Sequence, residues 1–226
     1  MSTNRNGVSA GKFNLNVSFS VGDNPENVTE NRRRFFSALG IDENIVAFTQ
    51  QEHTSVVCAC STPGNYPVSD ALITRSQHLF LAISVADCTP VMLYDPKTKT
   101  AAAIHAGWRG TTSKIVKKAI AKMYVHYGTK PANIVAFIGP SAGKCCYEVG
   151  NEVAKQFPDI CVERKPDRKY LLDVKQANVI QLLESGLQED HIEVHSDCTI
   201  HNQVYHSHRR DGKESGRMFA VIGMNN

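Results

Sequence analysis

Hydrophobic positions in this chain occur mainly as short runs bounded by turn residues, a pattern typical of buried strands. Run length, apolar content and the flanking turn residues favour strands over helices. Strands are predicted at 45–49, 54–60, 70–74, 79–86, 90–94, 100–106, 134–138 and 218–222. Residues 1–22 are polar and rich in Gly and Asn, which predicts irregular structure or a short edge strand.

Other segments carry helix start and stop signals instead. Asp23 can cap a helix that begins at Asn24-Pro25-Glu26 and reaches about Leu39, where Gly40 stops it. Further helices are predicted from Thr111 or Thr112 to Gly128, over about 150–156 and over 173–185. Mixed strands with intercalated helices indicate an α/β (α+β) sandwich. With no repeat or linker in evidence, we expect one domain over residues 1–226.

Composition excludes several classes of function. The 226 residues are 42% hydrophobic, enough for a substantial core. A net charge of +3 is too small to suggest nucleic acid as the partner. No apolar run approaches the roughly 20 residues of a membrane span. The amino terminus lacks the features of a secretory signal, so we expect a cytoplasmic protein whose seven cysteines are thiols.

The chemistry is expected where two apolar runs end. Cys88 follows the run 79–85, and His105 closes the run 100–104. If these strands are neighbours, both side chains meet at one edge of a sheet, beside Trp108. A nitrogen and sulfur pair of this kind either binds a transition metal or acts as nucleophile and base.

A catalytic zinc commonly has three protein ligands and one open position. Among nine histidines, His53 stands out because it precedes an apolar run at a loop-to-strand junction. The alternative, a buried cysteine with unrelated histidines, remains open on spacing alone. Cys145 and Cys146 would point to opposite faces of an extended segment, so they are not expected to chelate one ion together, and Cys198 is expected to be structural.

Arginines close to turns indicate anion binding. Guanidinium groups bind phosphate or carboxylate in a bidentate manner. The candidates are Arg5, Arg109, Arg210 and Arg217, whereas Arg209 is expected in a solvated turn. No GxGxxG or P-loop pattern is present, so no dinucleotide site is predicted.

Several motifs together resemble the laccase-domain, or polyphenol-oxidase-like, family, also called peptidoglycan editing factors. The matching segments are RNGVS at 5–9, QEH at 51–53, ADCTPV at 86–91, HAGWRGT at 105–111, IGPS at 138–141, CYEV at 146–149, DCT at 197–199 and RRDG at 209–212. The resemblance implies a layered mixed sandwich like the catalytic domain of cytotoxic necrotising factor. It also implies metal ligation by His53, Cys88 and His105. The chain departs from the family pattern in two places: Glu52 and Thr54 flank the first ligand in place of Val and Gly, and His208 replaces an aromatic residue.

Family members are described as purine nucleoside phosphorylases with adenosine deaminase activity. The resemblance therefore implies zinc at the three ligands and a small-molecule substrate, with phosphate held by arginines. Asp87 would orient a ligand or act as acid or base, alongside Cys88, His105 and Arg109 as catalytic residues. A homodimer is compatible with the sequence.

Three alternatives stay open at this point. Copper-dependent polyphenol oxidation fits one thiolate and two imidazoles, although laccase chemistry needs several coppers. A cysteine hydrolase would use Cys88 and His105 on amide bonds of cell-wall precursors. A non-enzymatic role would leave the site as a metal store or a partner site.

Overall fold

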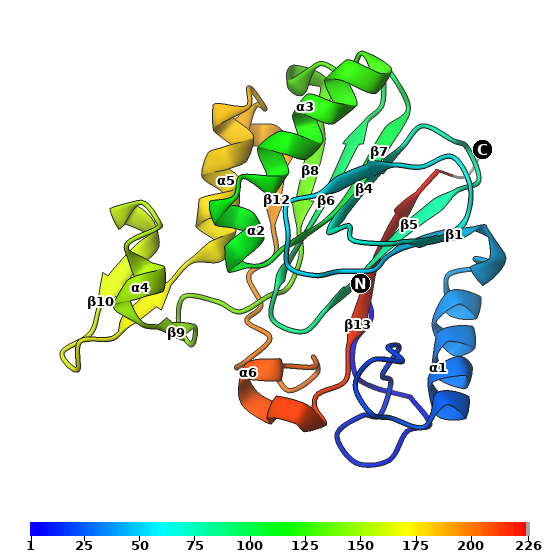
Figure 1. The fold of residues 1–226 in the computed structure, drawn as a ribbon, viewed down its shortest axis with the longest axis horizontal. Coiled ribbons are helices and arrows are strands. Elements are labelled where there is room, and N and C mark those ends of the chain that lie inside the picture. Colours follow the sequence, from blue (N-terminus) through cyan, green and yellow to red (C-terminus); the bar gives the residue numbers. More distant parts are fainter. Residues whose placement is uncertain (225–226) are drawn as a thin grey trace.

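Two sheets stacked face to face form the centre of the protein in a computed structural model that describes residues 1–224 (Figure 1). The six-stranded sheet has the order β12 (Ile192–Val194), β8 (Val135–Ile138), β6 (Thr89–Asp95), β7 (Thr100–Ala106), β4 (Ala71–Thr74) and β2 (Val57–Ala59). The four-stranded sheet has the order β13 (Met218–Gly223), β5 (Phe80–Val85), β1 (Val46–Thr49) and β3 (Gly64–Tyr66).

Helices cover the outer faces of both sheets, so the order of layers is helix, sheet, sheet, helix. Leu72 of β4 and Leu81 of β5 share the core between the sheets. On the opposite face of the larger sheet, α3 (Ile115–Tyr127) buries Met123 against β-strand residues, and α5 (Val174–Glu184) lies beside it. Helix α1 (Pro25–Ala38) packs Phe36 against Phe219 of the smaller sheet. This layering confirms the predicted mixed α/β sandwich.

A third, small sheet projects from the side of α5 (Figure 1). It has the order β10 (Val162–Arg164), β11 (Tyr170–Leu172) and β9 (Glu148–Val149), and α4 (Asn151–Ala154) packs on it. Two further short helices are α2 (Trp108–Thr112) and α6 (His208–Asp211). Short 3₁₀ turns occur at Glu43–Ile45, Pro131–Asn133, Asp159–Cys161, Glu189–His191 and Gly212–Glu214. No described helix is long and apolar enough to cross a membrane.

The helix predicted to start at Thr111 or Thr112 is in fact two helices. Helix α2 begins earlier, at Trp108, and both threonines lie inside it. Lys114 then adopts a left-handed conformation (φ 61°), which interrupts the helix before α3 begins. The predicted end is right, because Gly128 caps α3 with φ 70°.

The predicted pairing of the two strands that carry the chemistry is wrong. Strands β5 and β7 lie in different sheets. The antiparallel neighbour of β7 is β6, with Pro90 opposite His105. Cys88 is therefore positioned by the start of β6, not by the end of a strand beside β7. The expected outcome, Cys88 near His105, nevertheless holds, because β6 begins directly after that cysteine.

Several predicted bounds also change. The strand predicted over 54–60 is limited to β2, since the residues before it form the loop that carries His53. Asn24, not Asp23, caps α1: its side-chain oxygen accepts from the Glu26 N–H. The Asp23 carboxylate instead accepts bonds from Ser9 and Asn16, which hold the irregular segment 1–22 together.

A buried imidazole, that of His206, lies in the carboxy-terminal loop region. Its side chain is 1% exposed, and Nε2 has no hydrogen-bond partner among the described residues. A Cβ at Gly216 would lie 2.6 Å from the His206 ring, so the glycine allows this packing. Burial lowers the pKa of His206 to about 4. The ring is therefore neutral in the folded protein at pH 6.

We expect His206→Gln to flatten the acid dependence of stability. Between the folded pKa, about 4, and the ordinary value of 6.5, the unfolded chain binds more protons, so stability falls as the pH falls. This imidazole alone removes about 3 kcal/mol over that window. Urea unfolding at a series of pH values measures the slope. Equal slopes for His206→Gln and the parent would contradict the assignment.

Candidate active site

Three side chains far apart in the sequence converge beyond the edge of the six-stranded sheet. His53 comes from the loop before β2, Cys88 from the residue before β6, and His105 from the end of β7. Their ligand atoms lie within 4.8 Å of one another. Cys88 Sγ lies 3.9 Å from His53 Nε2, and the two imidazoles meet edge to face at 4.9 Å between centroids. His53 is exposed, Cys88 is half-buried and His105 is buried, so the group is open on one side.

Gly107 leaves the space in which these groups meet. A Cβ at this position would lie 3.0 Å from Cys88 Sγ and 3.4 Å from His53 Cδ2. The backbone here is also strained, since His53 has φ 58° and Asp87 has φ 83°. Non-glycine residues in this region cost about 1–3 kcal/mol each and concentrate at functional sites. The chain is therefore held out of its relaxed conformation on both sides of the cluster.

The carboxylate of Asp70 ties the histidines in place. It is fully buried at the residue before β4, and its Oδ1 lies 2.8 Å from His105 Nδ1. It also accepts bonds from the backbone N–H groups of Glu52, His53 and Thr54 and from the Thr54 hydroxyl. The sequence analysis missed Asp70. The available signal was an acid placed directly before the apolar residues 71–73 of a predicted strand.

Charges in the cluster stabilise one another. Burial acts to raise the pKa of Cys88, but the neighbouring His105 and His53 outweigh this effect and lower that pKa to about 6. Burial lowers the pKa of His105, whereas Cys88 and Asp70 raise it to about 9. Burial also acts to raise the pKa of Asp70, and hydrogen bonds from His105 and Thr54 outweigh it and bring that pKa to about 2. The sulfur is therefore a thiolate near neutral pH.

The donor set fits a transition-metal ion. A thiolate and two imidazoles are ligands of zinc and copper. Zinc bonds of about 2.3 Å to sulfur and about 2.1 Å to nitrogen place these two donors about 3.6 Å apart, close to the 3.9 Å between Cys88 and His53. Because His105 Nδ1 is bonded to Asp70, its Nε2 is left for an ion. Histidines that bind metals commonly have their other ring nitrogen bonded to a carboxylate in this way.

Asp87 does not contact these three side chains through its carboxylate. Its Oδ1 accepts from the Thr199 hydroxyl and its Oδ2 from the Arg209 N–H, at 2.7 and 2.6 Å. Asp87 thus connects the site to the loop at Thr199 and to helix α6, and Asp70 is the acid that contacts His105. The Arg209 side chain stacks on Tyr147, 5.0 Å from the ring centroid, and donates to the Glu148 carbonyl.

The other predicted arginines differ in what they contact. Arg210 is committed to the fold: its guanidinium donates to the carbonyls of Thr199, Ile200 and Tyr205 and to Asp211. Arg217 is partly buried, which lowers its pKa, and Cys88 and Asp87 are near enough to act in the opposite direction. Arg109 is exposed and stacks on Trp108 at 4.4 Å. Arg5 is exposed near the amino terminus.

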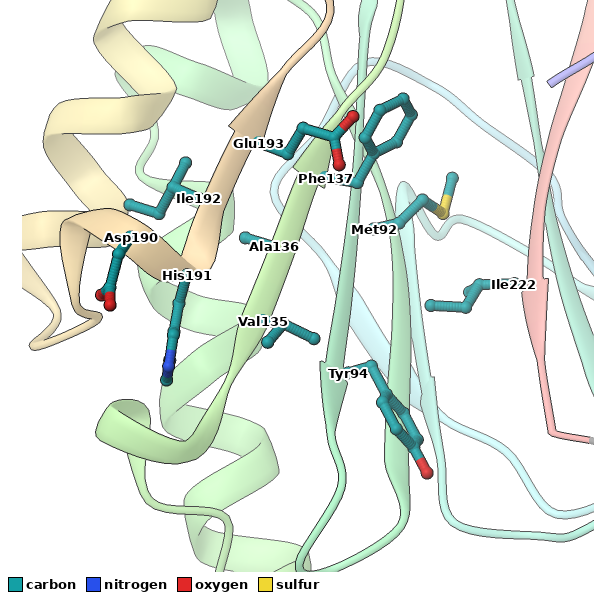
Figure 2. A pocket seen from close by; sticks show the side chains of 10 residues that line it. All are labelled: Met92, Tyr94, Val135, Ala136, Phe137, Asp190, His191, Ile192, Glu193 and Ile222. Atoms are coloured by element: carbon teal, nitrogen blue, oxygen red, sulfur yellow. The ribbon is translucent and has the colours of Figure 1, made fainter.

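The space beside the cluster is small. A hollow of about 40 Å³ is lined by Cys88, Gly107, Trp108 and Tyr147, among others. This volume admits a few water molecules or a small polar group, not a nucleoside. A larger hollow of about 560 Å³ lies elsewhere, along β6, β8 and β12, where Phe137, His191 and Ile222 line it (Figure 2). It contains none of the three converging side chains.

Comparisons with known proteins agree over almost the whole chain. The family model described as multi-copper polyphenol oxidoreductase laccase matches residues 1–225. A protein of Deinococcus radiodurans named purine nucleoside phosphorylase is 37% identical, covering 98% of this chain and 87% of its own. One of Bacteroides thetaiotaomicron with the same name is 34% identical, covering 98% and 89%. The crystal structure of YlmD from Geobacillus stearothermophilus has a TM-score of 0.94 and 32% identity, covering 99% of this chain and 90% of that one.

We expect Asp70→Asn to destabilise the metal-free protein by about 3 kcal/mol. Each carboxylate oxygen accepts hydrogen bonds from at least two donors. In either orientation of the asparagine amide, the NH₂ group replaces one of these oxygens and faces donors to which it cannot bond. The lowered pKa of Asp70 means that this contribution is present at pH 7 and is lost as the pH falls below about 4.

Urea unfolding in the presence of a chelator measures the loss. Thr54→Val is the matched comparison, because it removes one bond to the same carboxylate and should cost about 1 kcal/mol. Equal stability of Asp70→Asn and Thr54→Val would show that the Asp70 carboxylate does not hold His105 and the His53 loop together.

Proposed function

The chain belongs to the multi-copper polyphenol oxidoreductase laccase family, and on that premise we propose that it is a zinc-dependent purine nucleoside phosphorylase that also deaminates adenosine. The observation that carries the proposal is the convergence of His53, Cys88 and His105 beside an open hollow. The names of relatives such as those from Deinococcus and Bacteroides support this class of substrate. Adenosine, inosine and methylthioadenosine are the proposed nucleosides.

His53, Cys88 and His105 are the proposed metal ligands, and Asp70 holds His105 in the required tautomer. When bound, zinc supplies Lewis acidity toward an oxygen ligand, chemistry that suits both phosphate activation and hydrolytic deamination. The strained backbone at His53 and the absence of a side chain at Gly107 keep these donors directed toward one point.

Cationic side chains near the cluster are the proposed phosphate ligands. In phosphorolysis a phosphate oxygen bonds to the anomeric carbon of the ribose while the bond to the purine breaks, giving free base and ribose 1-phosphate. Arg109 has its guanidinium exposed beside Trp108, and Arg217 lies close to Cys88 and Asp87. Both can hold phosphate and stabilise the charge that develops. Arg5 is a third candidate, whereas the contacts of Arg210 leave it in a supporting role.

The nucleoside itself must lie across the open surface. The hollow beside Cys88 admits a phosphate or a reacting group only, at about 40 Å³. Trp108 and Tyr147 line it, and aromatic faces are suited to stacking with a purine. We therefore place the reacting end of the substrate in the hollow and the base against its aromatic rim.

A cysteine hydrolase is the second candidate, and one observation favours it. Cys88, His105 and Asp70 form a thiolate, imidazole and carboxylate series in which the pKa of the thiol is lowered to about 6. Copper-dependent polyphenol oxidation would use the same donors with a different metal. A chelator separates these functions, because it abolishes both metal-dependent activities and spares or activates the hydrolase.

We also propose a cytoplasmic setting for the enzyme. All seven cysteines are free thiols in the structure, and Cys88 must stay reduced to bind metal. A reducing compartment provides that condition.

The decisive test is incubation of zinc-loaded protein with inosine or adenosine, with and without phosphate, and chromatography of the bases. We expect free hypoxanthine or adenine only when phosphate is present, and phosphate-independent conversion of adenosine to inosine. Cys88→Ala should lose bound zinc and both activities, whereas Cys161→Ala, which changes a buried thiol outside the three proposed ligands, should keep them. Zinc-loaded protein that releases no base and deaminates nothing would refute the proposal.

Replacement by glutamine should change phosphate binding at Arg109 but stability at Arg210. Arg109→Gln removes a charge with no structural hydrogen bond among the described residues, so KM for phosphate should rise about tenfold or more at unchanged stability. Arg210→Gln removes donors to three carbonyls, so it should lower the unfolding midpoint first. Phosphate kinetics and urea unfolding of both variants provide the measurement. A phosphate KM unaffected by Arg109→Gln would remove Arg109 from the phosphate site.

A further inference from the structure

A second group of metal-binding side chains lies apart from the site described above. Cys145, Cys146 and Cys198 have their sulfur atoms within 4.8 Å of one another. The sequence analysis did not expect adjacent cysteines to chelate together, because an extended segment would turn them apart. The segment 144–146 is instead a turn, and the sulfurs of Cys145 and Cys146 are 3.4 Å apart.

Two chain segments are joined to bring the third thiol in. Ser141 and Cys198 form an isolated parallel bridge, which places Cys198 beside the start of the turn. The Gly143 N–H donates to Cys198 Sγ at 3.2 Å. A Cβ at Gly143 would lie 3.0 Å from Cys198 Cβ and 3.4 Å from the sulfurs of Cys145 and Cys198. The glycine therefore permits an approach of three thiols that any side chain there would hinder.

A buried cation lies beside one of the three thiols, that of Cys198. Lys175 is 8% exposed, and its ammonium group donates to the carbonyls of His195 and Asp197, directly before Cys198. A buried cation fixed beside a cysteine favours the ionised sulfur that metal binding requires. Cys145 is exposed, so an ion can reach the group from solvent.

We propose that Cys145, Cys146 and Cys198 form a binding site for a soft ion, Cu(I) first, separate from the His53, Cys88 and His105 site. Thiolates select Cu(I) and zinc over hard cations. A structural zinc site is almost always four-coordinate, whereas three sulfurs satisfy the trigonal coordination open to Cu(I). Three metal–sulfur bonds of about 2.3 Å in a trigonal plane place the sulfurs about 4.0 Å apart. The observed separations, 3.4 Å between Cys145 and Cys146 and at most 4.8 Å within the group, therefore need changes of less than about 1 Å.

An ion at this site would connect two loops that both contact Asp87. The Ala142 N–H donates to the Asp87 carbonyl, and the Thr199 hydroxyl donates to its carboxylate. Tyr147, which follows the turn, lines the hollow beside Cys88. An ion bound by the three cysteines therefore fixes one wall of the candidate active site, although it does not contact His53, Cys88 or His105.

The test is anaerobic titration with Cu(I) in competition with a colorimetric Cu(I) chelator, in a His53→Ala/Cys88→Ser protein that lacks two ligands of the first site. We expect one equivalent of Cu(I) to bind, and X-ray absorption to count three sulfur neighbours. Adding Cys145→Ser or Cys146→Ser should weaken binding by more than the roughly 100-fold attributed to loss of an outer-sphere partner. Both residues lie outside the core, and circular dichroism verifies that each variant folds.

The control is Cys58→Ser, which removes a partly buried thiol outside the group and should leave Cu(I) affinity unchanged. Cu(I) should also raise the thermal midpoint of the His53→Ala/Cys88→Ser protein, and not that of the same protein with Cys145→Ser added. Three results would overturn the proposal: no tight Cu(I) in the His53→Ala/Cys88→Ser protein, equal losses for Cys58→Ser and Cys145→Ser, or fewer than three sulfur neighbours. The readout does not involve nucleosides, so it stands or fails independently of the proposed phosphorylase.

Discussion

The buried carboxylate of Asp70 is the constraint on which the candidate site depends. Its side chain binds the imidazole of His105 and the backbone of the loop that carries His53, and its own carbonyl accepts the His105 N–H. An uncompensated carboxylate in this position would be costly, so its donors must all stay in place. One acid therefore holds two of the proposed ligands, from separate segments, in a fixed relation before any ion or substrate arrives.

The third proposed ligand, Cys88, is placed by the pairing of β6 with β7. The antiparallel register of β6 and β7 sets Pro90 opposite His105, so the residue preceding Thr89 emerges beside the histidine. Gly107 then leaves the gap between sulfur and ring empty. Rigid strands hold such positions more precisely than loops do. The layers of helix and sheet behind them serve mainly to keep these two strand ends immobile.

Asp87 lies between the two groups of metal-binding side chains. Its backbone carbonyl and carboxylate bind the loops that bring Cys145, Cys146 and Cys198 together, while its neighbour Cys88 belongs to the first group. Its positive φ shows that this connection is made at a conformational cost. Through Asp87, a change at the proposed site of Cys145, Cys146 and Cys198 can alter the position of residues beside Cys88.

Local sequence determined a good part of this protein. Apolar runs and helix signals located most of the longer strands and helices and the mixed α/β class, because burial and capping act over a few residues. The same reasoning singled out His53, Cys88 and His105 as strand-end residues, and the structure brings them together. The tertiary structure alone decided which strand pairs with β7 and that Asp70 is the acid beside His105. It also decided that the adjacent thiols of Cys145 and Cys146 meet the distant thiol of Cys198. Strand pairing, buried polar networks and turn geometry arise from contacts between distant segments, and periodicity along the chain carries no record of them.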